Sequence, residues 1–451
     1  MDLDRKRVLV VGLGRTGEAL CRFLLHQGAS VTVSEKKKAE ELGAKISSWK
    51  EQGIEVETGG HSQETFLKAD LIVLSPGVPW LPELEAAKKQ GIKIIAEIEL
   101  ASRFLKGKIV GISGSNGKST TATLTHKILK EGGLNAYLAG NIGVPLISFV
   151  EESKDDQIYV TELSSFQLKH TEKFRASISV LLNITPDHLD WHPSFKDYRD
   201  SKKKLLTNQG EGDSAVLNRD DPLVWPLKKE KKFQVYGFSQ KHRVSPGCFL
   251  QGNWIVLSGT KEAQLIRTSE IPLFGIHNQE NIMASALVGY ILGVPLFKIK
   301  DSIKNFQGLE HRLEKVATFK GIDFYNDSKA TNVDATLKSI QSFEQKIILI
   351  LGGRDKGGDF KKLKKPIKKR VKGIILLGEA KEKIQKALRG TVPITIASSM
   401  EEAVRLGYSL AEPGEVVLLA PACTSFDMFQ NFEERGMVFK QKVLNLGKEA
   451  Q

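Results

Sequence analysis

Residues 111–121 read GISGSNGKSTT, a glycine-rich turn with a lysine and hydroxyls behind it. Glycines let backbone N–H groups converge on a phosphate at a helix start, the lysine can reach the terminal phosphates of a nucleotide, and the hydroxyls can bind Mg²⁺. The usual NTPase motif needs glycine at position 112, where this chain has Ile112. The turn still predicts a nucleotide site, with a chance Gly-Lys-Ser turn as the alternative. Its candidate residues are Gly114, Ser115, Asn116, Gly117, Lys118, Ser119 and Thr120.

Polar side chains also follow two strand-like runs, QIYVTE (157–162) and SISVLLNIT (177–185). The residues in question are Glu162, Asn183, Asp187, His188 and Asp190. Open α/β sheets gather such groups at the carboxyl ends of their strands, and carboxylate, imidazole and hydroxyl groups around a triphosphate suit Mg²⁺. The sequence therefore predicts a magnesium site, although a structural, hydrogen-bonded role for His188 alone remains open.

A second glycine motif, VGLGRTG, places Gly12, Gly14 and Gly17 directly after the run RVLVVG, with Glu35 at the end of the next strand. A dinucleotide-binding fold puts its glycines and its ribose-binding acid at these places. The motif can hold any pyrophosphate, so UDP fits as well as NAD or FAD, and a purely structural turn is a third interpretation. Two phosphate-binding turns in one chain are more than a simple dehydrogenase needs.

Strand-like apolar runs alternate with helix-like segments along the chain, which predicts an α/β fold with parallel sheets. Three series of runs begin at residues 7, 106 and 322, and the pattern is less regular from 210 to 275. We predict a Rossmann-like N-terminal domain (1–105), a central P-loop-type ATPase α/β domain (106–309) and a Rossmann-like α/β C-terminal domain (310–451).

Composition excludes several classes of protein. The 451 residues are too many for one core, and the three cysteines have no paired spacing, which argues against a disulfide framework and a zinc site. No stretch approaches the roughly 20 apolar residues of a membrane span, and the N-terminus lacks a signal-peptide pattern. We expect a cytoplasmic protein without membrane insertion.

The net charge is +13, which permits polyanionic small molecules, a membrane surface or nucleic acid as partners. The basic run 361–370 is not interleaved with aromatic residues, so a solvated lysine-rich face is the favoured interpretation. A nucleic-acid-binding protein that is not an enzyme remains an alternative, and it predicts steep salt dependence of binding.

Several motifs in order along the chain together resemble the Mur ligases. They are GSNGKST, SPG (75–77), ELSSFQL (162–168), NITPDHLDWH with YRDSK (198–202), GIHNQEN (275–281), EHR (310–312), NDSKATN (326–332) and LGGRDKGGDF (351–360). The closing stretch SFDMFQNFEERG (425–436) is most similar to the member of this family that adds D-glutamate to UDP-N-acetylmuramoyl-L-alanine. The resemblance implies a monomeric, ADP-forming ligase of peptidoglycan precursor synthesis that needs no nucleic acid.

In the reaction that the resemblance implies, ATP phosphorylates a carboxylate, the amine of D-glutamate attacks the acyl phosphate, and the protein mainly positions groups and neutralises charge. Two Mg²⁺ ions are implied, one on Ser119 and Glu162 and a second on His188 and Lys202. A lysine cation cannot bind Mg²⁺, so the resemblance implies that Lys202 carries a carbamate. An ordinary lysine in the run SKKK is the alternative.

The resemblance also assigns the remaining site residues. Those implied for catalysis are Lys118, Asn141, His188 and Lys202. Those implied for the adenine, ribose and phosphates of ATP, beyond the glycine turn, are Asn278, Asn281, Arg312 and Asp327. Those implied for the UDP substrate are Gly14, Arg15, Thr16, Lys36, Ser75, Gly77 and Asn141. Those implied for D-glutamate are Lys329, Thr331, Lys356, Ser425 and Phe432, with a core role for Phe432 as the alternative.

One stretch departs from the family pattern. After the second strand the family tends to carry Asp-Thr-Arg, whereas this chain has Ser34-Glu35-Lys36, which leaves the contacts on the uracil side open. No Asp-Asn-Pro-Arg motif of the diaminopimelate-adding and lysine-adding ligases is present. Another amino-acid-adding Mur ligase, a folylpolyglutamate synthase-like ligase and a nicotinamide-dependent oxidoreductase remain alternatives.

Overall fold

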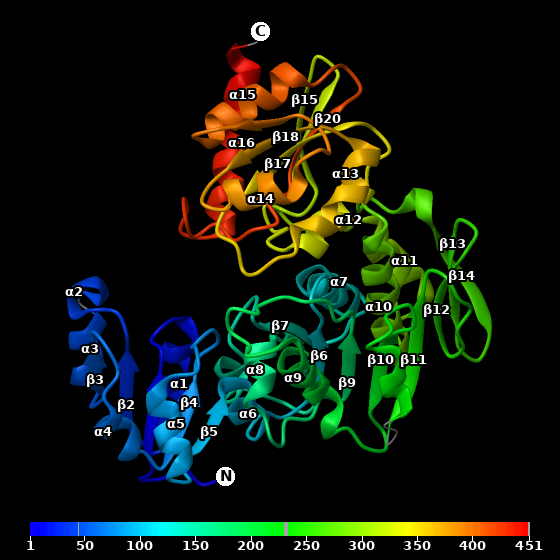
Figure 1. Ribbon diagram of the computed structural model, residues 1–451. Coiled ribbons are helices and arrows are strands. Elements are labelled where there is room, and N and C mark those ends of the chain that lie inside the picture. Colours follow the sequence, from blue (N-terminus) through cyan, green and yellow to red (C-terminus); the bar gives the residue numbers. More distant parts are fainter. Residues whose placement is uncertain (44, 230–232, 450–451) are drawn as a thin grey trace. The chain divides into compact units, whose positions relative to one another are not determined.

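A computed structural model describes residues 1–43, 45–229 and 233–449, and the chain divides into two compact units. The first unit comprises Met1–Ile184, Ser194–Leu265 and Ile282–Ser302. The second comprises Thr185–Pro193, Ile266–Asn281 and Ile303–Gln451. The described residues form three sheets, and Figure 1 follows them in chain order from the blue N-terminal sheet to the orange and red C-terminal segments.

The N-terminal sheet is parallel, with strand order β3-β2-β1-β4-β5. Its elements are β1 (Arg7–Val11), α1 (Arg15–His26), β2 (Ser30–Glu35), α2 (Ala39–Leu42), α3 (Lys45–Glu51), β3 (Glu55–Thr58), α4 (Gln63–Leu67), β4 (Leu71–Leu74), α5 (Pro82–Lys89), β5 (Lys93–Ala96) and α6 (Glu97–Ser102). The strand order reverses between β1 and β4, which is where open α/β sheets bind ligands.

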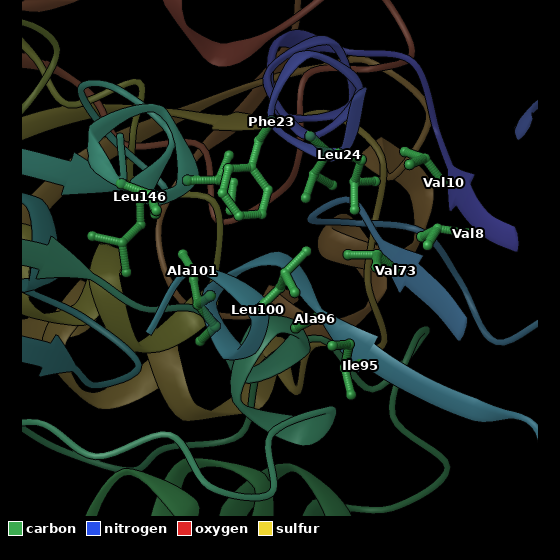
Figure 2. Close-up of a cluster of buried hydrophobic side chains, with 14 of the residues drawn as sticks. Val8, Val10, Phe23, Leu24, Val73, Ile95, Ala96, Leu100, Ala101 and Leu146 are labelled. Atoms are coloured by element: carbon green, nitrogen blue, oxygen red, sulfur yellow. The ribbon is translucent and has the colours of Figure 1, made fainter. Parts of the chain in front are cut away.

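Because both faces of this sheet are buried, its strands are continuous apolar runs in the sequence. Val8 and Val10 of β1 belong to one core cluster, whereas Leu9 and Val11 belong to another on the opposite face. Figure 2 shows part of the first cluster, in which Val10 lies near Leu24 of α1 and Val8 lies near Val73 of β4. The cluster extends to Leu146, so it also joins this sheet to the next part of the chain.

The central sheet has nine strands in the order β14-β13-β12-β11-β10-β9-β6-β8-β7. The neighbours from β7 to β12 pair in parallel, and β12 pairs with β13 in antiparallel. The elements are β6 (Lys108–Ser113), α7 (Lys118–Glu131), β7 (Ala136–Gly140), η1 (Leu146–Phe149), β8 (Ile158–Glu162), α8 (Ser165–Lys169), β9 (Ile178–Leu181), α9 (Phe195–Thr207), β10 (Ser214–Asn218), η2 (Trp225–Lys229), β11 (Gln234–Ser239), β12 (Gly247–Gln251), β13 (Trp254–Ser258), β14 (Glu262–Arg267), η3 (Thr268–Glu270), α10 (His277–Ile291) and α11 (Leu296–Lys304).

The C-terminal sheet has the order β15-β16-β20-β17-β18-β19, with β15 antiparallel to β16 and the other neighbours parallel. The elements are β15 (Glu314–Phe319), β16 (Ile322–Asn326), α12 (Val333–Gln341), β17 (Ile347–Gly352), η4 (Phe360–Leu363), α13 (Lys364–Arg370), β18 (Val371–Leu377), α14 (Lys381–Leu388), β19 (Ile394–Ile396), α15 (Met400–Leu410), β20 (Val416–Leu419) and α16 (Phe432–Glu449).

The predicted α/β class is confirmed, and each predicted apolar run contains a strand. The stretch 210–275, in which the sequence pattern is less regular, contains five strands, β10 to β14, among the described residues. In β14 (EAQLIR) only Leu265 and Ile266 are buried, so no apolar run of strand length marks this strand. The predicted domain boundaries at 105/106 and 309/310 stay predictions. No helix in the described part of the chain is long and apolar enough to cross a membrane.

Candidate active site

The glycine turn of residues 114–117 joins β6 to α7 and is held in place by the residue that follows the neighbouring strand β9. The Asn116 N–H donates to Asn183 Oδ1 at 2.9 Å, and Asn183 Nδ2 donates back to the Asn116 carbonyl at 3.1 Å. Gly117 caps α7 with φ +88°, a conformation that favours glycine. The turn is therefore shaped before any phosphate arrives, and a helix N-terminus lies behind it.

Two lysines approach this turn from different helices. Lys118 Nζ donates to the carbonyls of Gly114 and Ser115 at 2.9 and 3.0 Å, and Lys202 Nζ donates to the same Gly114 carbonyl at 2.8 Å. Lys202 is only 1% exposed, and its Nζ lies 4.7 Å from the ring centroid of Tyr198. Tyr198, which sequence reasoning missed, also hydrogen-bonds Ser115 Oγ through its hydroxyl at 2.8 Å.

Glu162 is the last residue of β8, which lies next to β6. One of its carboxylate oxygens accepts a hydrogen bond, whereas the other does not. Oε1 accepts a hydrogen bond from Asn141 Nδ2 at 2.9 Å, and the Asn141 N–H donates to the Glu162 carbonyl at 3.0 Å. Oε2 is buried without a hydrogen-bond partner among the described residues. Burying a carboxylate oxygen without a donor is costly, so this atom fits a cation.

The groups around Glu162 fit Mg²⁺ in particular. Ser119 and Thr120 are buried in the first turn of α7, and their hydroxyls are oxygen ligands of the kind that Mg²⁺ takes. Across the described ranges there is no group of three or more His, Cys, Asp or Glu side chains that could hold a metal. Mg²⁺ at a nucleotide site commonly uses one or two protein carboxylates together with substrate phosphates and water, so a single carboxylate suffices.

The first glycine motif lies at the reversal of strand order in the N-terminal sheet. Gly14, Arg15 and Thr16 begin α1 after β1, Ser75 and Gly77 follow β4, and Lys36 follows β2. Ser75 Oγ donates to the Gly12 carbonyl at 2.8 Å, and Arg15 Nη2 donates to the Gly143 carbonyl at 3.2 Å. The second bond connects this motif to the loop that carries Asn141.

Two residues of this motif have structural roles that account for their types. A Cβ at Gly17 would lie 2.1 Å from the Gly12 carbonyl oxygen, so only glycine lets the helix approach the strand. A ribose role for Glu35 belongs to the dinucleotide-binding interpretation, but its Oε2 accepts the Leu13 N–H at 2.6 Å and its Oε1 accepts the Lys37 N–H at 3.0 Å. Glu35 thus organises the glycine turn, which explains an acid at this place without a dinucleotide.

In the second unit, the residues predicted for adenine and ribose lie on short polar networks. Asn278 Nδ2 donates to the Phe274 carbonyl at 2.7 Å, and Asn281 Nδ2 donates to Asn278 Oδ1 at 2.9 Å. Asp327 follows β16 and accepts hydrogen bonds from the Leu313 N–H at 3.2 Å and from the Ser339 hydroxyl. His188 also belongs to this unit, with its side chain beside that of Asp187.

Burial raises the pKa of Asp327 from its ordinary 3.8 to about 6, against the opposing effects of the Ser339 hydroxyl and Arg312. Between these values the folded protein keeps a proton that the unfolded chain has lost, so the free energy of unfolding falls as pH rises. We expect wild type to lose about 2 kcal/mol relative to Asp327→Asn between pH 4 and pH 6. Urea unfolding of both proteins at the two pH values measures this difference, and parallel pH profiles would contradict it.

Candidate residues for D-glutamate follow three adjacent strands of the C-terminal sheet. Lys329 and Thr331 follow β16, Ser425 follows β20, and Lys356 follows β17. Lys329 Nζ lies 3.6 Å from the ring centroid of Phe432. The strand order thus brings four of the five predicted residues to one edge, and the fifth stacks on one of them.

A cavity of about 270 Å³ lies at this edge, lined by Thr331 and Lys356 and also by Asp187, Asp334 and Asp355. Lys356 Nζ forms an ion pair with Asp187 Oδ1 at 3.0 Å, and Asn332 Nδ2 donates to Asp187 Oδ2 at 3.0 Å. The side chains of Lys329, Ser425 and Phe432 do not line this cavity. The structure therefore groups the predicted residues into two sets, one in the cavity and one beside it.

Arg435 is a further residue that sequence reasoning missed. Its guanidinium is 2% exposed and donates to the Ser328 hydroxyl and carbonyl at 2.9 and 2.7 Å and to the carbonyls of Cys423 and Thr424, both at 3.1 Å. Burial lowers the pKa of this guanidinium to about 10. Arg435 thus ties the loop of Lys329 to the loop of Ser425. The one sequence feature that could have indicated this role is the Arg435-Gly436 pair in the C-terminal helix.

Comparison with known proteins accounts for this arrangement. The N-terminal domain of MurD-like Mur ligases matches residues 6–96, the Mur ligase middle domain matches 112–289, and the Mur ligase glutamate ligase domain matches 311–423. The chain belongs to the Mur ligase family, and its three-domain α/β architecture is that of the family.

Two relatives that match over nearly the full length share one name. The UDP-N-acetylmuramoylalanine–D-glutamate ligase of Acidobacterium capsulatum is 47% identical over 98% of this chain and 97% of its own. The enzyme of the same name from Koribacter versatilis is 46% identical over 100% of this chain and 99% of its own. Neither relative is named an oxidoreductase or a nucleic-acid-binding protein, so these two alternatives gain no support.

Solved structures share the fold at lower identity. A pseudomurein peptide ligase type C from Methanothermus fervidus superposes with a TM-score of 0.62 at 21% identity, covering 98% of this chain and 100% of its own. The UDP-N-acetylmuramate-alanine ligase MurC from Thermotoga maritima gives a TM-score of 0.61 at 17% identity, covering 99% and 100%.

Proposed function

We propose that this chain catalyses the ATP-dependent addition of D-glutamate to UDP-N-acetylmuramoyl-L-alanine, with release of ADP and phosphate. The observation that carries the proposal is the 46–47% identity, over nearly the whole chain, to ligases named for this reaction. The two glycine motifs supply the two phosphate sites that a nucleotide-linked substrate and ATP require. The reaction belongs to peptidoglycan precursor synthesis, and we propose that it takes place in the cytoplasm. We propose a monomer with domain boundaries near 105/106 and 309/310.

The first step transfers phosphate to the substrate. A carboxylate oxygen of UDP-N-acetylmuramoyl-L-alanine attacks the γ-phosphorus of ATP, the bond to the bridging oxygen breaks, and an acyl phosphate and ADP form. The Lys118 ammonium and the backbone N–H groups of the glycine turn hold the transferred group, because they stabilise the negative charge that develops on its oxygens. Bound Mg²⁺ would neutralise phosphate charge, and Glu162 Oε2 with the Ser119 hydroxyl would hold it. Thr120 lies in the same helix turn.

The second step forms the amide. The amine of D-glutamate attacks the acyl carbon and loses a proton, and the phosphate leaves. We propose that Lys356 exchanges its ion pair with Asp187 for a carboxylate of D-glutamate in the cavity, with Thr331 as a hydroxyl donor. Lys329, Ser425 and Phe432 shape the adjacent surface, and Arg435 holds their loops. Two cationic groups suit a substrate with two carboxylates.

For ATP we propose that Asn278 and Asn281 lie near the adenine and that Arg312 and Asp327 lie near the ribose and phosphates. For the nucleotide substrate we propose the turn Gly14-Arg15-Thr16 and Lys36, Ser75, Gly77 and Asn141. A second Mg²⁺ on His188 and a carbamate of Lys202 completes the proposal. The amine of Lys202 would combine with CO₂ and release a proton to become an anionic oxygen ligand.

The Lys202 carbamate is testable by labelling. With ¹³C-bicarbonate and Mg²⁺, wild type should give a carbamate carbon signal that disappears in Lys202→Ala. Lys203→Ala is the matched control because Lys203 is the next residue on α9 and is half-buried, so it should keep the signal. An active wild-type protein without label would contradict the carbamate.

The reaction itself is tested by phosphate release. Purified protein, ATP and Mg²⁺ are incubated with UDP-N-acetylmuramoyl-L-alanine and with D-glutamate, L-glutamate, L-alanine or no amino acid. We expect release that requires both the nucleotide substrate and D-glutamate. Release with another acceptor would instead indicate another amino-acid-adding Mur ligase or a folylpolyglutamate synthase-like ligase.

A further inference from the structure

A hydrogen-bonded relay of side chains spans the carboxyl ends of β2 and β3. Ser34 is fully buried, and its hydroxyl donates to Glu57 Oε2 at 2.6 Å and lies 2.8 Å from His61 Nδ1. Glu57 Oε1 accepts a further hydrogen bond from the Thr65 hydroxyl at 3.1 Å. The roles proposed above for the glycine motifs, the lysines and the metal-site residues do not involve this cluster.

The relay fixes the tautomer of His61. A carboxylate can only accept hydrogen bonds, so the single proton of the Ser34 hydroxyl points to Glu57. The Ser34 oxygen must then accept from His61, which places a proton on Nδ1 and leaves Nε2 of the neutral ring as an acceptor. The ring is half-buried and packs edge-on against Phe66, with centroids 5.9 Å apart. Among the described residues Nε2 makes no hydrogen bond.

Strand register places the segment of His61 at the same edge of the sheet as the glycine turn. Ser34 pairs with Val11 of β1 on one side and with Glu57 of β3 on the other, and its carbonyl accepts the Gly12 N–H at 2.9 Å. The Gly59 N–H donates to the Lys37 carbonyl at 2.8 Å, so the loop of His61 adjoins the loop of Lys36. Two strand spacings, about 10 Å, separate the ends of β1 and β3. A nucleotide with its diphosphate on the turn and its base toward β3 spans such an interval.

We infer that His61 is the residue of this chain that selects uracil, through acceptance of the uracil N3–H by Nε2. The inference rests on the proposed function, because it takes a UDP substrate at this turn. Uracil presents an N–H between two carbonyls, whereas cytosine presents a lone pair at the same position. An imidazole acceptor therefore pairs with uracil and leaves two lone pairs opposed with cytosine. The stretch Ser34-Glu35-Lys36, which departs from the family pattern, contributes the serine that sets the tautomer.

Calorimetric titration of the full chain with UDP, CDP and N3-methyl-UDP tests this inference. Wild type should bind UDP about 10-fold more tightly than the other two, as expected for one satisfied against one unsatisfied polar group. His61→Phe keeps a flat ring but lacks the acceptor, so its affinity for UDP should fall about 10-fold and the three ligands should converge to within about 3-fold. His61→Gln, which restores an acceptor oxygen, should recover part of the preference for UDP.

His26→Phe is the matched control, because it removes an exposed imidazole of the same domain that pairs with Glu151; it should bind as wild type does. A wild-type preference that survives in His61→Phe would overturn the inference, as would equal binding of UDP and CDP by wild type. Both results leave the proposed function intact, since phosphate release with D-glutamate can still occur. Conversely, a preference for UDP lost in His61→Phe would support the inference even if D-glutamate failed to stimulate phosphate release.

Discussion

Lys118→Ala is expected to lower the turnover of phosphate release by about 10³-fold, the scale seen when a preorganised charge donor at a developing anion is removed. The ammonium of Lys118 lies at the first turn of α7 and is held by the carbonyls of Gly114 and Ser115. Negative charge develops on the γ-phosphoryl oxygens during phosphate transfer, and we expect the Lys118 ammonium to stabilise this charge. The affinity for UDP should stay within about 3-fold of wild type, because the uridine nucleotide uses a different sheet.

Lys127→Ala is the matched control for this prediction. Lys127 lies on the same helix, and its Nζ pairs with Glu131 at 2.5 Å on the surface. An exposed pair of this kind contributes little to stability, so turnover should stay within about 2-fold of wild type. Steady-state phosphate release at saturating ATP measures both variants, and thermal unfolding checks that Lys118→Ala remains folded. Comparable rates for the two variants would contradict a role of Lys118 in transfer.

The glycine turns could be predicted from the sequence because their signal is local. One strand is followed by Gly12, Gly14 and Gly17, and another by Gly114 and Gly117. The positive φ angles and the close packing that glycine allows depend on residues a few positions away. The strands themselves could be predicted for a similar reason, since parallel strands with two buried faces are unbroken apolar runs. No such run marks β14, in which only Leu265 and Ile266 are buried.

The groups that tune the site could not be predicted, because each depends on packing between segments distant in sequence. Tyr198 reaches Ser115 across 83 positions, and Arg435 reaches Ser328 across 107. Whether Glu162 Oε2 finds a hydrogen-bond donor depends on all the groups packed around it, so no sequence pattern predicts it. Glu35 shows the converse case, in which a residue in the expected place for a ribose ligand is used by the backbone of the turn.

Glu162→Gln is expected to lower turnover by at least about 10²-fold and to raise the Mg²⁺ concentration for half-maximal phosphate release. In wild type Oε1 is occupied by Asn141, and Oε2 is buried without a donor among the described residues. The amide retains one oxygen, which Asn141 can occupy, but it brings an NH₂ group to the place of Oε2. A donor at that place cannot bind a cation, and the negative charge that attracted the cation is lost.

Thermal unfolding separates this role from a structural one. A ligand that binds only the folded state raises the melting temperature, so Mg²⁺ with ADP should stabilise wild type and should stabilise Glu162→Gln much less. Glu151→Gln, an exposed carboxylate paired with His26, is the control and should respond as wild type does. If Mg²⁺ with ADP shifted all three proteins equally, Glu162 would not hold the metal, and its unsatisfied oxygen would need another partner. The measurement uses ADP rather than ATP, so it reports binding of the metal and nucleotide independently of whether D-glutamate is the acceptor.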